Sequence, residues 1–196
     1  MTPHQETFIR YFSQISPLTV EEAEGIAQSM QTKTFQKGEY LLRQGQVSGS
    51  TFFILEGCVR EYTVKDIEEQ TTHFFTEGQW AISLNSFGTD QAATHNWVCV
   101  EKTTVVVGDE QQAQQLFQQF PRFETISRTI MEAAFSEQKA ALTSYYTDTP
   151  EERYLKVLQQ RPGLIQRVPQ YHLASYIGVK PESLSRIRKR IASKEG

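Results

Sequence analysis

Apolar residues recur at three- and four-residue steps through residues 7–31, a spacing that predicts helical structure. A Ser-Pro-Leu-Thr stretch at residues 16–19 interrupts the pattern, so two helices are expected at the start of the chain. Thr19 is the expected N-cap of the second helix, because Glu21 and Glu22 would then lie in a first turn that favours negative charge.

From residue 33 to residue 107 the apolar period changes to two, and turn-forming residues recur about every eight to twelve positions. This pattern is typical of an antiparallel sandwich or barrel. Residues 65–68 lie between two runs of similar length and are expected to form a hairpin tip. The expected strands cover residues 34–36, 40–43, 51–56, 58–64, 69–75, 96–100 and 103–107.

A glutamine-rich segment at residues 109–120 predicts a short helix on the barrel, ended by Pro121. Apolar residues then recur over about 24 residues without Pro or Gly, which predicts a long helix. This stripe either covers the barrel or pairs with a second copy of the chain. Its spacing favours the pair, although Glu137 interrupts it, so we expect a homodimer with Ile130 near the two-fold axis. The stripe consists of Phe123, Ile126, Ile130, Ala133 or Ala134, and Ala141.

Thr149 and Pro150 have the chemistry of a helix start, because Thr caps well and Pro fits the first helical position. They place a boundary after the long helix, with a further helix at 150–160 and a break at 161–163. The expected fold class is α+β. Its parts are a β jelly roll with N-terminal helices at residues 1–120, the long dimerisation helix and hinge at 121–148, and a helical domain at 149–196.

The segment 168–187 has the spacing of a helix-turn-helix. Ala174 allows two helices to approach closely, and Gly178 allows the sharp turn between them. The second helix begins at Lys180 or Pro181 and carries a polar, cationic face suited to a DNA major groove. The residues expected to contact DNA are Lys180, Glu182, Ser183, Ser185, Arg186, Lys189 and Arg190, and Lys194 is expected to contact phosphate. The alternative is an amphipathic helix whose basic face is only solvated.

Charge is divided unevenly along the chain, whose formal net charge is −3. Residues 1–149 hold 10 Lys and Arg and 19 Asp and Glu, whereas residues 150–196 hold 10 Lys and Arg and 4 Asp and Glu. A basic segment that also contains spaced apolar residues is expected to fold and to present its charge on a surface. Nucleic acid is the polyanion that this arrangement favours.

The composition is that of a globular protein, with 38% hydrophobic and 22% charged residues. No membrane-spanning run and no secretion signal is apparent, so the cytoplasm is the expected location. Cys58 and Cys99 are too few for a disulfide framework or an iron–sulfur cluster and are expected to be buried thiols. No cofactor and no metal is expected, although His73, His95 or Cys58 leaves haem ligation open.

An enzyme is not expected either. The four histidines, at positions 4, 73, 95 and 172, lack the spacing of a metal-dependent barrel enzyme, and no nucleophile elbow or phosphate-binding glycine loop occurs. We therefore assign no catalytic residue. An effector-binding or scaffold protein whose basic C-terminal face binds another anionic partner is the alternative function.

Taken together, these segments resemble the Crp/Fnr family of transcription regulators over residues 7–192. The resemblance is carried by KGEYLLRQG at 37–45, FFILEG at 52–57 and PESLSR at 181–186. It implies a sequence-specific, DNA-binding homodimer that contacts RNA polymerase. It also implies that Glu182 and Arg186 read bases and that Ser183 and Ser185 contact backbone or bases, while Pro181 replaces an arginine often used in this set.

Members of this family that sense a cyclic nucleotide hold its ribose with a Gly-Glu pair and its phosphate with an Arg. Here Ile82 and Ser83 occupy the positions of the Gly-Glu pair, and Thr94 occupies the position of the arginine. Because charge-assisted contacts are worth about 1.5–3 kcal/mol each, these changes predict that cyclic AMP is not the effector. The expected pocket suits an unidentified neutral or apolar molecule, and a protonated His95 would add a conditional cation. Its expected lining is Trp80, Ser83, Thr94 and His95.

Overall fold

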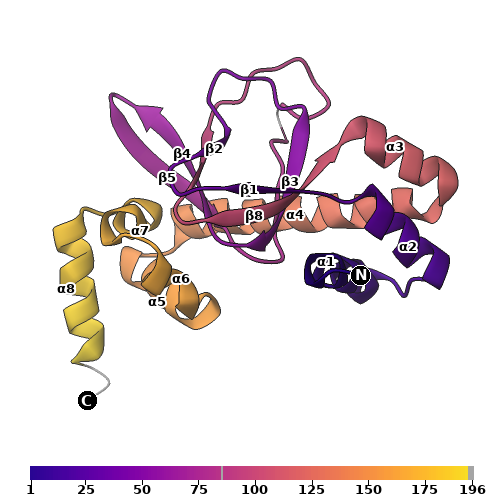
Figure 1. The fold of residues 1–196 in the computed structure, drawn as a ribbon. Coiled ribbons are helices and arrows are strands. Elements are labelled where there is room, and N and C mark those ends of the chain that lie inside the picture. Colours follow the sequence, from indigo (N-terminus) through magenta and orange to yellow (C-terminus); the bar gives the residue numbers. More distant parts are fainter. Residues whose placement is uncertain (85, 194–196) are drawn as a thin grey trace.

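The computed structural model describes residues 1–84 and 86–193. Two four-stranded antiparallel sheets form a β roll, and helices lie on one side of it and at its C-terminal end (Figure 1). One sheet has the order β1-β8-β3-β6 and the other β2-β7-β4-β5, which confirms the expected α+β class. The strands are β1 Gln31–Phe35, β2 Tyr40–Leu42, β3 Ser50–Glu56, β4 Val59–Lys65, β5 Glu68–Phe75, β6 Trp80–Ala81, β7 Asn96–Cys99 and β8 Thr103–Asp109.

The two sheets pack face to face because alternate side chains along their strands are apolar. Phe52 of β3 and Trp97 of β7 meet in this core, with ring centroids 6.1 Å apart. The β4–β5 hairpin turns at Asp66 and Ile67, whose φ angles of 49° and 67° are positive. The expected hairpin tip is thereby confirmed. The two-residue strand β6 was not expected, because so short a run has no readable period.

Two helices precede the roll, as expected: α1 Pro3–Ile15 and α2 Val20–Ser29. Thr19 caps α2, since its hydroxyl accepts from the Glu22 N–H and the Glu22 carboxylate accepts from the Thr19 N–H. Phe8 of α1 packs on Phe53 of β3 with 5.1 Å between ring centroids. These contacts place the N-terminal helices over the outer face of the sheet that contains β3.

The helices α3 Glu110–Gln119 and α4 Arg122–Thr147 follow β8, as expected. Phe123, Ile126 and Ile130 of α4 are buried in the core that α1 and α2 form with the roll. The expectation that Ile130 lies at a dimer axis is therefore wrong. This part of the stripe covers the chain's own roll, the alternative that the same spacing allowed.

The second half of α4 has a different surface. Phe135, Leu142 and Tyr146 are 59%, 57% and 79% exposed. They follow one another at steps of seven and four residues, so they lie along one side of the helix. We call these three residues the exposed stripe of α4.

Four helices complete the described chain: α5 Pro150–Gln160, α6 Pro162–Arg167, α7 Gln170–Ile177 and α8 Pro181–Ala192. Thr149 caps α5 and Pro150 occupies its first turn, as expected. The break expected at 161–163 is confirmed at Arg161 only, and α6 starts at Pro162, because Pro fits the first turn of a helix. Among the described residues, no helix combines the length and the apolar character needed to cross a membrane.

The packing of α4 predicts unequal effects for neighbouring substitutions. Ile130→Ala should lower the free energy of unfolding by about 2–5 kcal/mol, because it leaves a cavity in the core. The matched control Thr129→Ala, on the exposed side of α4, should change it by about 0.5 kcal/mol or less. Denaturant unfolding measures both. If Ile130→Ala dissociated the protein in sedimentation without lowering subunit stability, the assignment of Ile130 to the chain's own core would be wrong.

Candidate nucleic-acid interface and sensor cavity

The helices α7 and α8 form the expected helix-turn-helix around a single left-handed residue. Gly178 has a φ of 76°, and its N–H donates to the Ser175 carbonyl at 3.1 Å. The Val179 N–H donates to the Ala174 carbonyl at 2.9 Å, which completes the cap of α7. A Cβ at position 178 would lie 3.0 Å from the Tyr145 ring of α4. Backbone conformation and space therefore both favour glycine here.

The face of α8 that points away from the protein carries most of the residues expected to contact DNA. Leu184, Ile187 and Ile191 are buried against α5 and α7, which leaves the opposite side to solvent. Figure 1 shows α8 at the end of the molecule farthest from α3. The exposed members of the expected set are Lys180, Glu182, Ser185, Arg186, Lys189 and Arg190, whereas Ser183 is half-buried.

Two of these side chains have intramolecular partners. The Arg186 guanidinium donates to the Ser183 hydroxyl at 3.1 Å, which holds both on one side of α8. Arg190 forms an ion pair with Glu151 of α5 at 2.8 Å. Lys194 lies outside the described residues.

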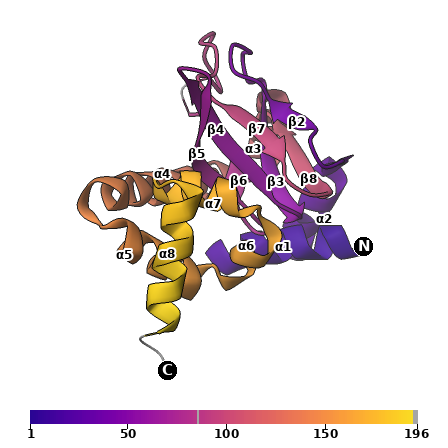
Figure 2. The same ribbon diagram turned by 90° about the vertical axis from the view of Figure 1, so that its left-hand side faces the viewer.

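The helix-turn-helix docks on the β roll through α7, which packs against β5 (Figure 2). The Thr71 N–H donates to the Ser175 hydroxyl at 2.9 Å, and that hydroxyl donates to the Glu69 carbonyl at 3.2 Å. The Gln70 side chain donates to the Ser175 carbonyl at 2.6 Å. One serine of α7 thus binds three consecutive residues of the edge strand, a contact that the sequence did not indicate.

Two arginines of the C-terminal helices strengthen this docking. Arg167 donates to the Glu77 carboxylate at 2.8 Å and also forms an ion pair with Glu101. Arg161 donates to the Phe74 carbonyl at 2.8 Å. Burial alone would raise the pKa of Glu77, yet the hydrogen bonds from Arg167 and from the Gly57 N–H lower it overall. The docked state therefore favours an ionised Glu77.

A buried cation lies beneath α7. Arg60 of β4 donates to the Thr71 hydroxyl at 2.8 Å and to the Glu69 carboxylate at 2.6 Å. Burial and the nearby Arg60 charge lower the pKa of His172 in α7 to about 4. A neutral His172 is therefore part of the docked arrangement, because its protonated form would be poorly solvated beside a guanidinium.

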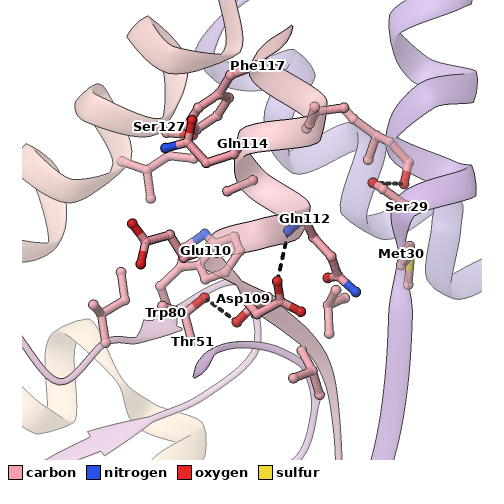
Figure 3. A pocket seen from close by; sticks show the side chains of 18 of the residues that line it. Ser29, Met30, Thr51, Trp80, Asp109, Glu110, Gln112, Gln114, Phe117 and Ser127 are labelled. Carbon is pink, nitrogen blue, oxygen red and sulfur yellow. Dashed lines mark hydrogen bonds between the residues drawn. The ribbon is translucent and has the colours of Figure 1, made fainter. Parts of the chain in front are cut away.

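A cavity of about 350 Å³ lies between the roll and the helices α1 to α4 (Figure 3). Its wall includes Trp80, one of the four residues expected to line an effector pocket, but not Ser83, Thr94 or His95. Ser83 is buried elsewhere, and Thr94 is exposed in the segment before β7. The structure therefore does not bring the four residues together around this cavity.

His95 instead lies beside a carboxylate that the sequence analysis missed. Its Nε2 is 3.8 Å from the Glu61 carboxylate, which accepts a hydrogen bond from the Trp97 indole at 2.9 Å. No hydrogen-bond partner of His95 Nε2 occurs in the part of the chain that the structure describes. The signal for this pair was the single acidic residue of β4, which does not indicate its partner.

The low pKa of His172 predicts an acid sensitivity of the docked structure. Between pH 6.5 and about 4 the unfolded chain binds a proton at His172 that the folded chain does not. The free energy of unfolding is therefore highest above pH 6.5, as far as His172 is concerned, and falls as the pH is lowered toward 4. His172→Gln should reduce the drop in melting temperature between pH 7 and pH 5, whereas the control His4→Gln, at a half-buried position of α1 far from α7, should not. Equal drops in wild type and His172→Gln would contradict the role assigned to His172.

Comparisons with known proteins agree with this architecture. Residues 32–120 match the cyclic nucleotide-binding domain family. The chain is 23% identical over 186 residues to the transcriptional activator protein Anr of Pseudomonas aeruginosa, which covers 88% of this chain and 75% of that protein. Its fold is similar to that of FixK2 from Bradyrhizobium japonicum, with a TM-score of 0.71 and 12% identity. The match covers 85% of this chain and 86% of FixK2. Its fold is also similar to that of a transcriptional regulator of the Crp/Fnr family from Eubacterium rectale, with a TM-score of 0.67 and 12% identity. That match covers 94% of this chain and 88% of the other.

The domain match covers the β roll and α3, and the likeness in fold continues through α4 into the helix-turn-helix. Each of these regions carries part of the resemblance expected from the sequence. Residues 32–120 therefore match a cyclic nucleotide-binding domain, and the fold of the chain, with a long helix and a helix-turn-helix after that domain, is similar to that of the two regulators named above.

Proposed function

We propose that the protein is a cytoplasmic, homodimeric transcription regulator that binds specific DNA sequences through α8 and does not respond to cyclic AMP. The observation that carries this proposal is the exposed polar and cationic face of α8, supported from behind by the buried Leu184, Ile187 and Ile191. The docking contacts described above involve α7 and its neighbours, so they leave that face uncovered.

The chemistry of α8 suits direct readout of bases. A guanidinium such as that of Arg186 can donate two hydrogen bonds to guanine, and a carboxylate such as that of Glu182 can accept from cytosine. Both lie in the first half of α8, the part of a recognition helix that contacts base edges in helix-turn-helix complexes. Lys189 and Arg190, farther along, would contact phosphates and contribute affinity without sequence preference.

The exposed stripe of α4 supports a dimer. Phe135, Leu142 and Tyr146 present apolar area on one side of a helix, and a second copy related by a two-fold axis would cover it. Such a dimer would place two α8 helices about one DNA turn apart, near 34 Å, and would read an inverted repeat. The contact with RNA polymerase that the family resemblance implies belongs to this proposal as well.

Local charge argues against a cyclic nucleotide in the roll. The Glu61 carboxylate lies beside His95. Its negative charge would repel the negative charge of a cyclic phosphate bound there. Arg60 of the same strand is already bound to Glu69 and Thr71. A phosphate buried without a cation loses hydration that nothing replaces.

Enrichment from a pool of random duplexes tests the main proposal. The expected result is an inverted repeat bound with an affinity that falls steeply as salt rises, because phosphate contacts release counterions. Binding to acidic lipid vesicles or to an acidic protein, with no duplex enriched, would instead support the effector-binding or scaffold alternative and overturn the regulator.

Substitutions in α8 should separate base readout from phosphate contact. Arg186→Ala should cost about 1–3 kcal/mol on the enriched site and relax the preference at one base pair of each half-site. Lys189→Ala is the matched control and should weaken all duplexes alike, with a smaller salt dependence. Gel shifts on the enriched site and on its single-base variants measure both. Equal, non-selective losses would overturn the assignment of Arg186 to base readout.

The exposed stripe predicts where the dimer can be broken. Leu142→Glu should place two like charges across the two-fold axis and raise the dimer dissociation constant by about a hundredfold or more. Thr143→Glu, one position away from the stripe, is the control and should leave the dimer intact. Sedimentation measures the assembly state. A wild-type monomer at micromolar concentration, or a Leu142→Glu dimer as tight as wild type, would contradict the placement of the interface.

A further inference from the structure

We propose that the cavity between the β roll and the helices α1 to α4 is the effector site, and that it takes an uncharged, largely apolar molecule. The regulatory part of this proposal rests on the proposed function, whereas ligand binding itself does not. The site lies on the outer face of the sheet that contains β3 and β8, and not in the core between the two sheets.

Apolar side chains from the four helices and from the sheet make up much of the cavity wall. Helices α1 and α2 contribute Phe8, Phe12 and Ile26, and the sheet contributes Trp80 and Val106. Protein interiors seldom leave voids much larger than a water molecule. A space of about 350 Å³ is within the range of small-molecule pockets and would hold a ligand of two or three rings.

Small residues keep this space open. Ala113 of α3 and Gly108 of β8 form part of the wall. A Cβ at Gly108 would lie 2.9 Å from the Thr51 hydroxyl, so a larger residue would disturb the wall itself. Figure 3 shows Thr51 and Trp80 on one side of the cavity, with Phe117 and Ser127 across from them. The cavity thus lies where the helices α1 to α4 meet one face of the roll.

The charges at the cavity select against anions. Among the described residues that line it there are two carboxylates, Asp109 and Glu110, and no Lys, Arg or His. Asp109 accepts from the Gln112 N–H at 2.8 Å and thereby caps α3. A carboxylate, sulfonate or phosphate on a ligand would meet these negative charges without a compensating cation.

Trp80 adds a hydrogen-bond donor to a wall that also holds the hydroxyl groups of Thr51 and Ser127. Its indole Nε1 is buried and has no hydrogen-bond acceptor in good geometry among the described residues. The Tyr11 hydroxyl is its polar neighbour: burial raises the pKa of Tyr11 and the Trp80 N–H lowers it, but the two groups are not aligned for a full hydrogen bond. An ether or carbonyl oxygen on the ligand would complete the hydrogen bonding of this N–H. We therefore assign the occupant to uncharged aromatic or alicyclic molecules with a single acceptor.

One wall of the cavity belongs to α4, which gives an occupant a means to act on the rest of the molecule. Ser127, Ile130 and Met131 line the cavity, and four residues after Met131 the exposed stripe of α4 begins at Phe135. A ligand that fits one position of α4 better than another would shift the balance between them. The helix continues to Thr147, directly before the cap of α5.

Two probes that differ only in charge test the class of ligand. N-phenyl-1-naphthylamine is uncharged, whereas 8-anilino-1-naphthalenesulfonate carries the same rings with a sulfonate. Fluorescence titration of the wild-type protein without DNA should give micromolar binding of the amine and binding at least about tenfold weaker for the sulfonate. Cyclic AMP should not displace the amine. Equal affinities, or displacement by cyclic AMP, would overturn the proposal.

A filling substitution locates the binding. Ala113→Phe should weaken binding of the naphthylamine by about tenfold or more, because the ring takes up cavity volume. Ala140→Phe is the matched control on the exposed surface of α4 and should bind as wild type does. Circular dichroism verifies the fold, and Ser127→Leu fills the opposite wall if Ala113→Phe does not fold. Wild-type affinity in a folded filling variant would overturn the site.

A gel shift on the enriched duplex, with and without the naphthylamine, tests the regulatory part. A change in DNA affinity in wild type that Ala113→Phe abolishes supports the effector role. Probe binding without any change in DNA affinity overturns that role. If the protein binds the probe but no duplex, the proposed function is overturned. The ligand site is then still supported by the fluorescence titration.

Discussion

The structure depends on the burial of the first half of α4 against the β roll. Phe123, Ile126 and Ile130 enter the core that Phe8 and Phe53 also share, so this helix, the N-terminal helices and the roll form one body. Each such side chain, fully buried, contributes about 1.5–3 kcal/mol relative to an exposed position. The anchored half fixes the direction in which the second half leaves the roll. It thereby fixes where the exposed stripe and the helix-turn-helix lie.

The same helix shows what a pattern can and cannot predict. Its length and its three- and four-residue spacing were readable in the sequence, but the spacing is the same for a helix on its own barrel and for a helix on a second copy. The choice depends on which surface is already apolar at that place, and this is settled by residues such as Phe12, more than a hundred positions earlier. Long-range packing of this kind leaves no local signal.

The helix-turn-helix was predictable to the residue for the opposite reason. Gly178 is required by a left-handed backbone conformation, and Ala174 by close approach of two helices, so both constraints act within a few positions of the chain. The same holds for the caps at Thr19 and Thr149. Of the four residues expected to line an effector pocket, the structure places only Trp80 at the cavity beside the helices α1 to α4. The rest of that wall comes from segments that lie far apart in the sequence, and no local motif connects them.

The docking of α7 on β5 sets a condition on any activity of α8. Edge strands expose backbone groups that lack partners within the sheet. Here the Ser175 hydroxyl bonds to the Thr71 N–H and the Glu69 carbonyl of β5, and Arg161 donates to the Phe74 carbonyl of the same strand. The same interface also buries apolar side chains, because Cys58, Phe74 and Val100 of the roll join the core of the C-terminal helices. Phe74 of β5 packs on Tyr176 of α7 with 5.3 Å between ring centroids. Any activity of α8 that needs another orientation would therefore have to expose this apolar area, which costs more than breaking the partly exposed ion pairs.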